Sequence, residues 1–194
     1  MDAIEHLLAE LEDFGAANDA RHDARAKRML NITRDTGQLL AVLVQAGAAR
    51  RVLEIGTSNG YSTLWLARAA RALGGRVTTL EYAADKHALA LANFARAGLQ
   101  DSVQAVLAEA GGVLAETPDG AYDLVFLDSE RSQYLAWWPH IARALRPGGV
   151  LVVDNATSHY GEMAAFLEGI DADPRYTSCL VPVGKGEFIA VKSA

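Results

Sequence analysis

The sequence predicts a doubly wound α/β fold of three layers, with helices on both faces of a mostly parallel sheet. From Arg51 onward, short apolar runs alternate with longer segments of helical periodicity, which is typical of parallel strands joined by helices. Two last apolar runs, YTSCLVPV and FIAVK, are separated only by a short segment that contains Gly184 and Gly186. That segment is too short for a helix, so we expect an antiparallel C-terminal hairpin.

The residues before this alternation have a helical pattern. Apolar residues recur at helical spacing over 2–15. A second helix is expected to begin near Asp35, because Asp35 and the glutamine three residues later have the spacing of a capping box. We therefore expect one domain over 1–194, with a helical cap over 1–48 and a sheet core over 49–194.

A short basic cluster lies between these two helices and consists of Arg21, Arg25, Lys27 and Arg28. Asp23 interrupts it, so a solvated helix face is the simplest interpretation. A role in substrate binding or in a lid is the alternative.

The elements after residue 50 follow in a regular order. The expected parallel strands are RVLEI, RVTTLE, SVQAVL, YDLVFLD and VLVVDN, and helices are expected near 61–73, 84–97, 110–116, 132–145 and 160–170. Pro147 and the two glycines after it are expected to stop the fourth of these helices.

The composition is that of an ordinary globular protein, with 51% hydrophobic and 22% charged residues. A net charge of -6 and the lack of a long basic stripe argue against a nucleic-acid partner. The N-terminus does not resemble a signal peptide and no apolar stretch could span a bilayer, so we expect a soluble, cytoplasmic protein with no membrane partner. The single cysteine, Cys179, excludes an internal disulfide, and its apolar neighbours predict a buried, inert thiol.

A glycine turn follows the first predicted strand. Gly56 and Gly60 allow the backbone to turn sharply and to approach a ligand closely. The turn leads into a helix N-terminus, where free N–H groups favour a carboxylate or phosphate, and Ser62 adds a hydroxyl group there. The dinucleotide pattern G-x-G-x-x-G is absent, because Ser58 stands two residues after Gly56. A tight turn without a ligand is the alternative.

Acidic and amide side chains end three other strands. Glu81 ends the second strand, where an acid can accept hydrogen bonds from both hydroxyls of a ribose, with an exposed acid as the alternative. Asp128 ends the fourth strand, and Asp154 and Asn155 end the fifth. If these strands are neighbours, the three side chains can bind a hard cation such as Mg²⁺. Helix capping by Asp128, or its hydrogen bond to a ligand amine, and turn capping by the pair are the alternatives.

In the order of these motifs, the chain resembles the class I S-adenosylmethionine-dependent methyltransferases, and more closely the O-methyltransferases related to catechol and caffeoyl-CoA O-methyltransferase. The motifs that carry the resemblance are MLNITRDTGQLL, VLEIGTSNGYSTLWLA, TLE, DLVFLDSERSQY and LRPGGVLVVDN. The resemblance implies a seven-stranded sheet whose last strand is antiparallel. It also implies S-adenosylmethionine as the cofactor, a small hydroxylated aromatic acceptor and a possible homodimer.

The resemblance further implies which residues bind the cofactor and the cation. The glycine turn would hold the methionine half of S-adenosylmethionine, Glu81 the ribose and the segment around Ala108–Ala110 the adenine. The implied cofactor-binding residues are Thr33, Glu54, Gly56, Thr57, Ser58, Gly60, Ser62, Glu81, Ala108, Glu109 and Asp128. The implied ligands of a divalent cation, with Mg²⁺ expected, are Asp128, Asp154 and Asn155.

One position departs from the family pattern. Three residues after the first metal-binding aspartate, the catechol and caffeoyl-CoA enzymes carry a lysine that is assigned as the general base, whereas this chain has Arg131. A guanidinium is effectively always protonated, so Arg131 cannot take a proton, but it can stabilise an oxyanion or hold an acidic substrate. His159, four residues after Asn155, is the candidate base, because imidazole exchanges protons near neutral pH. An exposed loop histidine is the alternative.

Other functions stay open alongside this one. The first is a metal-independent methyltransferase for another small-molecule oxygen or nitrogen, and the second is a non-catalytic cofactor-binding module that regulates a partner. An NAD-dependent dehydrogenase is disfavoured by the missing glycine pattern and by the terminal hairpin. The aromatic residues Tyr134, Trp137 and Trp138 are expected in the core or in a dimer interface rather than in a substrate wall.

Overall fold

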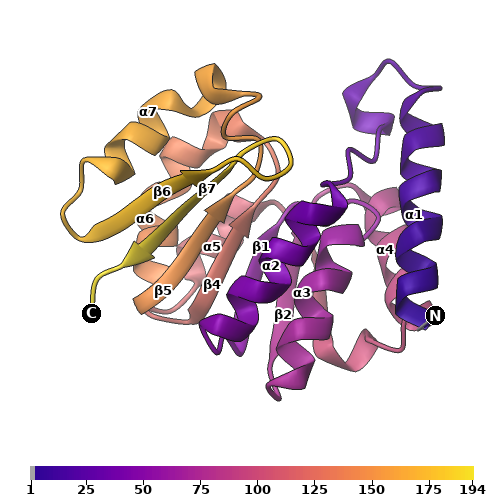
Figure 1. The fold of residues 1–194 in the computed structure, drawn as a ribbon, viewed down its shortest axis with the longest axis horizontal. Coiled ribbons are helices and arrows are strands. Elements are labelled where there is room, and N and C mark those ends of the chain that lie inside the picture. Colours follow the sequence, from indigo (N-terminus) through magenta and orange to yellow (C-terminus); the bar gives the residue numbers. More distant parts are fainter. Residues whose placement is uncertain (1–2) are drawn as a thin grey trace.

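Seven strands form one sheet in the computed structural model, which describes residues 3–194, and helices cover both faces of the sheet (Figure 1). The strands are β1 (Arg51–Ile55), β2 (Arg76–Glu81), β3 (Val103–Leu107), β4 (Tyr122–Leu127), β5 (Leu145–Val153), β6 (Tyr176–Val181) and β7 (Glu187–Lys192). Their order across the sheet is β3-β2-β1-β4-β5-β7-β6. Strand β7 runs antiparallel to both of its neighbours, and the other paired strands are parallel. The predicted fold class is therefore confirmed.

The helices between the strands lie close to their expected positions. The α-helices are α1 (Ala3–Asp19), α2 (Arg34–Ala46), α3 (Tyr61–Ala72), α4 (Ala84–Arg96), α5 (Ala110–Glu116), α6 (Tyr134–Ala144) and α7 (Tyr160–Asp171), and the 3₁₀ turns are η1 (Arg25–Lys27), η2 (Gln100–Ser102) and η3 (Arg131–Gln133). The expected capping box at Asp35 was wrong. Thr33 caps α2, because it has the extended backbone that an N-cap needs and its hydroxyl accepts a hydrogen bond from the Thr36 N–H.

Alternating side chains along the central strands form two cores, one on each face of the sheet. Val52 and Phe126 pack with α1, α2, α3 and α4, whereas Leu53, Val125 and Val153 pack with α5, α6 and α7. A strand buried on both faces must be a nearly continuous apolar run, which is why these strands were recognisable in the sequence. Figure 1 shows α2 and α3 in front of the sheet, with α1 beside them.

Hydrogen bonds to α1 hold the second half of the segment between α1 and α2. The carboxylate of Asp19, the last residue of α1, accepts hydrogen bonds from the backbone N–H groups of Met29 (2.6 Å) and Leu30 (2.9 Å). Leu30 has a left-handed backbone with φ of 53°, which turns the chain toward the carboxyl ends of the strands. Residues 28–32 form the segment that we call the strap.

The sheet leaves β6 as an edge strand, and this overturns the expectation for Cys179. The thiol is exposed, because β6 pairs only with β7 and most of its side chains are not covered by another element. Among residues 3–194, the structure contains no helix whose length and hydrophobicity would allow it to cross a membrane.

Candidate active site

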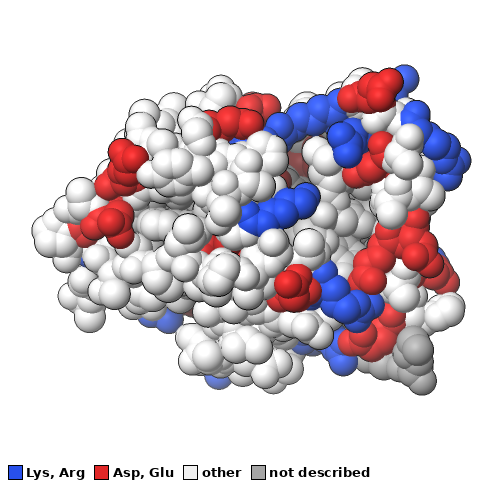
Figure 2. All heavy atoms as spheres, turned by 45° about the horizontal axis from the view of Figure 1, so that its top comes forward, with Lys and Arg blue, Asp and Glu red and all other residues white. Residues whose placement is uncertain are grey.

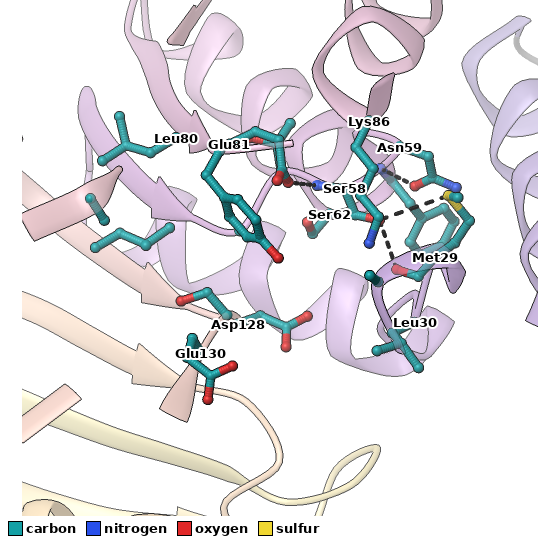
Figure 3. A pocket seen from close by; sticks show the side chains of 18 of the residues that line it. Met29, Leu30, Ser58, Asn59, Ser62, Leu80, Glu81, Lys86, Asp128 and Glu130 are labelled. Carbon is teal, nitrogen blue, oxygen red and sulfur yellow. Dashed lines mark hydrogen bonds between the residues drawn. The ribbon is translucent and has the colours of Figure 1, made fainter. Parts of the chain in front are cut away.

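A cavity of about 550 Å³ lies beyond the carboxyl ends of β1, β2 and β4 (Figure 3). The strand order reverses between β1 and β4, and such a switch point is where ligands bind in open α/β sheets. Many residues proposed from the sequence line this cavity, namely Gly56, Thr57, Ser58, Ser62, Glu81, Ala108, Glu109 and Asp128.

The glycine turn after β1 depends on two positions where a side chain does not fit. Gly56 has a φ of +108°, and a Cβ atom there would overlap the backbone carbonyl of Asp128. Gly60 has a φ of +87°, and a Cβ atom there would lie 2.6 Å from the ring of Phe94. Glycine therefore allows β1 and β4 to come together at the cavity floor and allows the turn to pack on α4.

Glu81 is fixed at the cavity wall by the backbone. Its Oε2 accepts a hydrogen bond from the Ser58 N–H at 2.8 Å (Figure 3). Its Oε1 accepts one from the Ala83 N–H at 2.9 Å. The side chain is only 6% exposed. Each oxygen retains acceptor capacity, so the carboxylate can bind two further donors from the cavity side.

Glu54 lies beneath the turn and does not line the cavity. It is fully buried, and the hydroxyls of Ser62 (2.5 Å), Thr79 (2.6 Å) and Thr63 donate hydrogen bonds to it. Burial raises the pKa of the Glu54 carboxyl to about 7, although the three hydroxyl donors oppose this rise. Glu54 therefore supports the helix N-terminus from below through Ser62 and Thr63.

This buried acid predicts a pH-dependent stability. In the unfolded chain Glu54 titrates near its ordinary pKa of 4.5, so between that pH and about 7 the folded chain holds a proton that the unfolded chain has lost. Stability is therefore lost as the pH rises through this window, by on the order of 3 kcal/mol. We expect Glu54→Gln, compared with the parent chain by urea unfolding without cofactor, to be relatively more stable at about pH 8 than at about pH 5. An equal difference at both pH values would contradict this assignment.

The three proposed metal ligands are brought together by neighbouring strands. β4 and β5 pair in parallel, so Asp128 lies beside Asp154 and Asn155. The Asn155 amide nitrogen donates to Asp154 Oδ2 at 2.5 Å and to Asp128 Oδ1 at 3.3 Å. Glu187, the first residue of β7, is fully buried in the same region and was not found by sequence reasoning. Thr36 donates to its Oε1 at 2.9 Å, and its Oε2 has no partner among the described residues.

The electrostatics of this acid cluster fit a cation. Burial and the charge of Asp154 raise the pKa of Asp128 well above its usual range, although Lys185 acts in the opposite direction. Burial and the same aspartate raise the pKa of Glu187 to about 10. Buried acids that repel each other in this way are stabilised by a positive charge between them. Within residues 3–194, no group of three or more acidic, histidine or cysteine side chains is placed to hold a metal ion.

Besides Glu54, six predicted site residues do not line the cavity, namely Thr33, Gly60, Arg131, Asp154, Asn155 and His159. The Thr33 hydroxyl caps α2 and lies against Gly184. Arg131 is only 5% exposed, and its Nε donates to Glu162 at 2.7 Å. His159 precedes α7, and its Nδ1 lies 2.8 Å from Ser158 Oγ. The Ser158 hydroxyl donates to Asn155 Oδ1 at 3.3 Å and thereby connects the imidazole with the acid cluster.

Comparison with known proteins identifies the family. A model of a family described as O-methyltransferase matches residues 4–193. The chain belongs to this O-methyltransferase family. The methyltransferase is 40% identical over 158 residues to a catechol O-methyltransferase of Mycobacterium tuberculosis, covering 81% of this chain and 70% of that protein. It is 33% identical over 162 residues to a catechol O-methyltransferase of Niastella koreensis, covering 79% and 72%.

Solved structures agree with this family. An O-methyltransferase from Bacillus cereus in complex with SAH is 29% identical, with a TM-score of 0.78, and the match covers 100% of this chain and 91% of that one. TomG from Streptomyces achromogenes, in complex with SAM, is 26% identical, with a TM-score of 0.79 and the same coverage. The predicted family and enzyme class are confirmed, and the protein is an S-adenosylmethionine-dependent O-methyltransferase.

The strap of the methyltransferase lines the cavity, which sequence reasoning missed. Met29, Leu30, Asn31 and Ile32 form part of the wall. The Ser58 hydroxyl donates to the Met29 carbonyl at 2.7 Å, and Lys86 donates to the Arg28 carbonyl at 2.7 Å. The motif that carried the family resemblance includes the strap, but its sequence alone did not indicate which of its residues would face the cavity.

Aromatic and basic side chains complete the wall. Tyr82 and Trp137 line the cavity, so Trp137 is not only a core residue. The core prediction holds for Tyr134 and Trp138, which pack against Phe166. In the basic cluster of the sequence, Arg21, Arg25 and Lys27 are exposed, as expected for a solvated segment. Arg25, in η1, lines the cavity. For this residue, the alternative of a role in substrate binding or in a lid therefore stays open.

Proposed function

We propose that this methyltransferase transfers the methyl group of S-adenosylmethionine to a hydroxyl oxygen of a small catechol- or phenol-like acceptor, with the assistance of a divalent cation. One observation carries the proposal: Asp128 lines the cavity and also contacts Asn155 in the acid cluster. The cofactor cavity and a cation would thus share one wall. The catechol O-methyltransferases among the relatives support the acceptor class.

The cavity wall offers a partner for each part of the cofactor. The glycine turn and the N-terminus of α3 suit the carboxylate of the methionine half, because free backbone N–H groups lie at a helix start. Glu81 suits the two ribose hydroxyls, since its carboxylate is fixed by Ser58 and Ala83 and still has lone pairs to offer. Ala108 and Glu109, on the other side of Glu81, suit the adenine edge.

The chemistry demands little acid catalysis from the protein. Bound in the cavity, S-adenosylmethionine supplies a methyl group on a sulfonium, and the departing thioether is neutral. The chain therefore has to hold an ionised acceptor oxygen in line with the sulfur–methyl bond and to exclude water. Orientation of this kind lowers barriers by up to roughly 7–11 kcal/mol in favourable cases. The strap over Ser58 closes the cofactor side of the cavity.

The acid cluster fits the role of a cation site. Asp128, Asp154 and Asn155 would hold the ion, and oxygen donors of this kind suit Mg²⁺. Held by these residues, a divalent cation would supply Lewis-acid chemistry, which would favour the ionised form of a nearby acceptor hydroxyl at neutral pH. Arg131 cannot act as a base, and we assign it to the anionic acceptor as a fixed positive charge.

Chelation tests the metal part of this proposal. We expect EDTA to lower methylation of a catechol and phenol panel at least about tenfold, and added Mg²⁺ to restore it, because the ion favours the reactive form of the acceptor. Asp154→Asn should weaken Mg²⁺ binding in calorimetry, whereas Asp119→Asn, at an exposed position away from the cavity, should not. Full activity in EDTA would instead indicate metal-independent methylation of an oxygen or nitrogen.

His159 is our candidate for the base that takes the proton from the hydroxyl group of the methyl acceptor. It adjoins the acid cluster through Ser158 and Asn155. We expect His159→Ala to lower kcat by about tenfold or more, because general base catalysis contributes at least this much in typical enzymes. Cofactor affinity, measured by calorimetry, should change little, and His140→Ala on α6 is the matched control. Unchanged turnover of the His159 variant would exclude the role.

A further inference from the structure

Asp19 stands at a position that its own helix does not favour. It is the last residue of α1, where the free backbone carbonyls carry the negative end of the helix dipole and a carboxylate is unfavourable. Its side chain is nevertheless only 16% exposed. A charge that is placed against the local preference and kept from solvent indicates that a contact with a distant segment requires it.

That contact is with the strap. One oxygen of the Asp19 carboxylate accepts a hydrogen bond from the Met29 N–H at 2.6 Å, and the other accepts one from the Leu30 N–H at 2.9 Å. The Asn18 amide donates to Oδ1 at 3.0 Å, and the Nε of Arg28 lies 4.0 Å from Oδ2. Asp19 does not line the cavity, so its carboxylate serves the strap and not a ligand.

Leu30 has a backbone conformation that leucine rarely adopts. Its φ of 53° lies in the left-handed region, which a side chain with a Cβ atom disfavours. Such a conformation persists only where surrounding contacts hold it, and it is found often at ligand clamps. The bond from the Leu30 N–H to Asp19 is a contact of this kind. Without this bond, we expect the strap to leave its present conformation.

The other side of the strap is bound to residues of the cavity wall. The Met29 carbonyl accepts a hydrogen bond from the Ser58 hydroxyl at 2.7 Å (Figure 3). The Arg28 carbonyl accepts one from Lys86 at 2.7 Å. Ser58 and Lys86 line the cavity, and the Ser58 N–H donates to Glu81. A movement of the strap therefore changes the wall on which the cofactor would lie.

Little apolar burial holds the strap in place. Residues 20–27, which precede it, are largely exposed, and residues 28–31 are half-buried. Figure 2 shows Lys and Arg side chains beside the hollow in this face of the molecule. A segment that is held mainly by a few hydrogen bonds opens at a low cost in free energy, as ligand-binding loops and lids do. The loss of one of these bonds should therefore have a large effect on how often the strap is open.

We propose that Asp19 is a positioning residue for the cofactor: it holds the strap over bound S-adenosylmethionine, and the cofactor leaves when the strap opens. Asp19 acts through the backbone of Met29 and Leu30 and touches no reacting atom. This inference rests on the place proposed above for the cofactor in the cavity. It requires neither the cation nor a particular acceptor.

Asp19→Ala tests the inference. The Kd of S-adenosylmethionine in calorimetry should rise about tenfold or more, because the closed strap becomes a minor state. The rate of cofactor dissociation, followed by tryptophan fluorescence in stopped flow, should rise by a similar factor, since Trp137 lines the cavity. At saturating cofactor, kcat should fall less than about threefold, because the variant affects cofactor binding and not the reacting groups. Asp19→Asn keeps one acceptor oxygen, so it should retain part of the affinity.

Hydrogen exchange separates the hold on the strap from general stability. Without cofactor, Asp19→Ala should speed the exchange of the Met29 and Leu30 amides about tenfold or more and should leave the amides of β1 unchanged. In the parent chain, saturating cofactor should slow the exchange of the same two amides about tenfold or more. This second measurement does not depend on the folding of a variant.

Asp13→Ala is the matched control, because Asp13 is an exposed acid on the same helix and lies outside the cavity lining. It should change neither the Kd nor the exchange rates. A Kd for Asp19→Ala within about threefold of the parent value would overturn the inference, as would strap amides whose exchange does not respond to the cofactor. If Glu81→Ala weakened cofactor binding in the same experiments, the proposed function would stand. If Glu81→Ala also kept the parent affinity, the place proposed for the cofactor would be wrong as well.

Discussion

Gly56→Ala is expected to destabilise the fold by about 3 kcal/mol or more, because the new Cβ atom would overlap the Asp128 carbonyl at a backbone φ of +108°. The clash is with backbone and not with the end of a flexible side chain, so β1 and β4 would have to move apart. For a chain of this size, the melting temperature should fall by about 8 °C or more. Cofactor binding should be lost as well, since the displaced turn forms the cavity floor.

Gly169→Ala is the control for this substitution. Gly169 lies inside α7, and a Cβ atom there has nothing within 4 Å. Alanine should stabilise the helix by up to about 1 kcal/mol. Thermal unfolding of both variants, followed by circular dichroism, makes the comparison. A Gly56→Ala chain that melts with the parent and binds the cofactor would show that the close approach of the two strands is not required.

Glu81→Ala is expected to weaken binding of S-adenosylmethionine by about 100-fold or more in calorimetry, because each hydrogen bond to a charged group contributes about 1.5–3 kcal/mol. The same change frees the Ser58 N–H, so part of the loss comes from the turn. A cofactor analogue that lacks one ribose hydroxyl separates the two effects. The analogue should bind to the parent chain more weakly than the cofactor does. To the Glu81→Ala chain, the analogue and the cofactor should bind with equal affinity.

Glu116→Ala, at the exposed end of α5, controls for loss of a negative charge and should leave the affinity unchanged. If Glu81→Ala bound the cofactor within about threefold of the parent, the assignment of Glu81 to the ribose would be excluded. If the affinity fell by the same factor from the cofactor to the analogue in the parent chain and in the Glu81→Ala chain, Glu81 would act only on the turn.

The central strands and the residues at their ends could be predicted because they depend on local signals. Parallel strands buried on both faces are continuous apolar runs, and the carboxyl ends of neighbouring strands meet at one edge. Gly56, Glu81 and Asp128 were therefore found by position alone, and the structure brings them to one cavity. The relation of His159 and Arg131 to the acceptor stays a prediction.

Residues whose place depends on long-range contacts could not be predicted. In the sequence, Glu187 is one more acid before a strand, and only the pairing of β7 with β5 buries it beside Asp154 and Asp128. The strap reached the cavity because Asp19 and Ser58 bind its backbone, and backbone contacts leave little trace in the sequence. Cys179 was misjudged because an apolar run does not reveal which strand lies at the edge of a sheet.

Local order along the chain was enough to establish the α/β class, the family and the set of polar side chains at the strand ends. Packing between distant segments decided which of these side chains are buried, what holds them and which charges face each other. Arg131 illustrates the division: its chemistry was known from its identity, but only the folded chain buries its side chain and pairs its Nε with Glu162 on α7. Hydrogen-bond partners and desolvation are properties of the folded chain, and they determine what a charged group is free to bind.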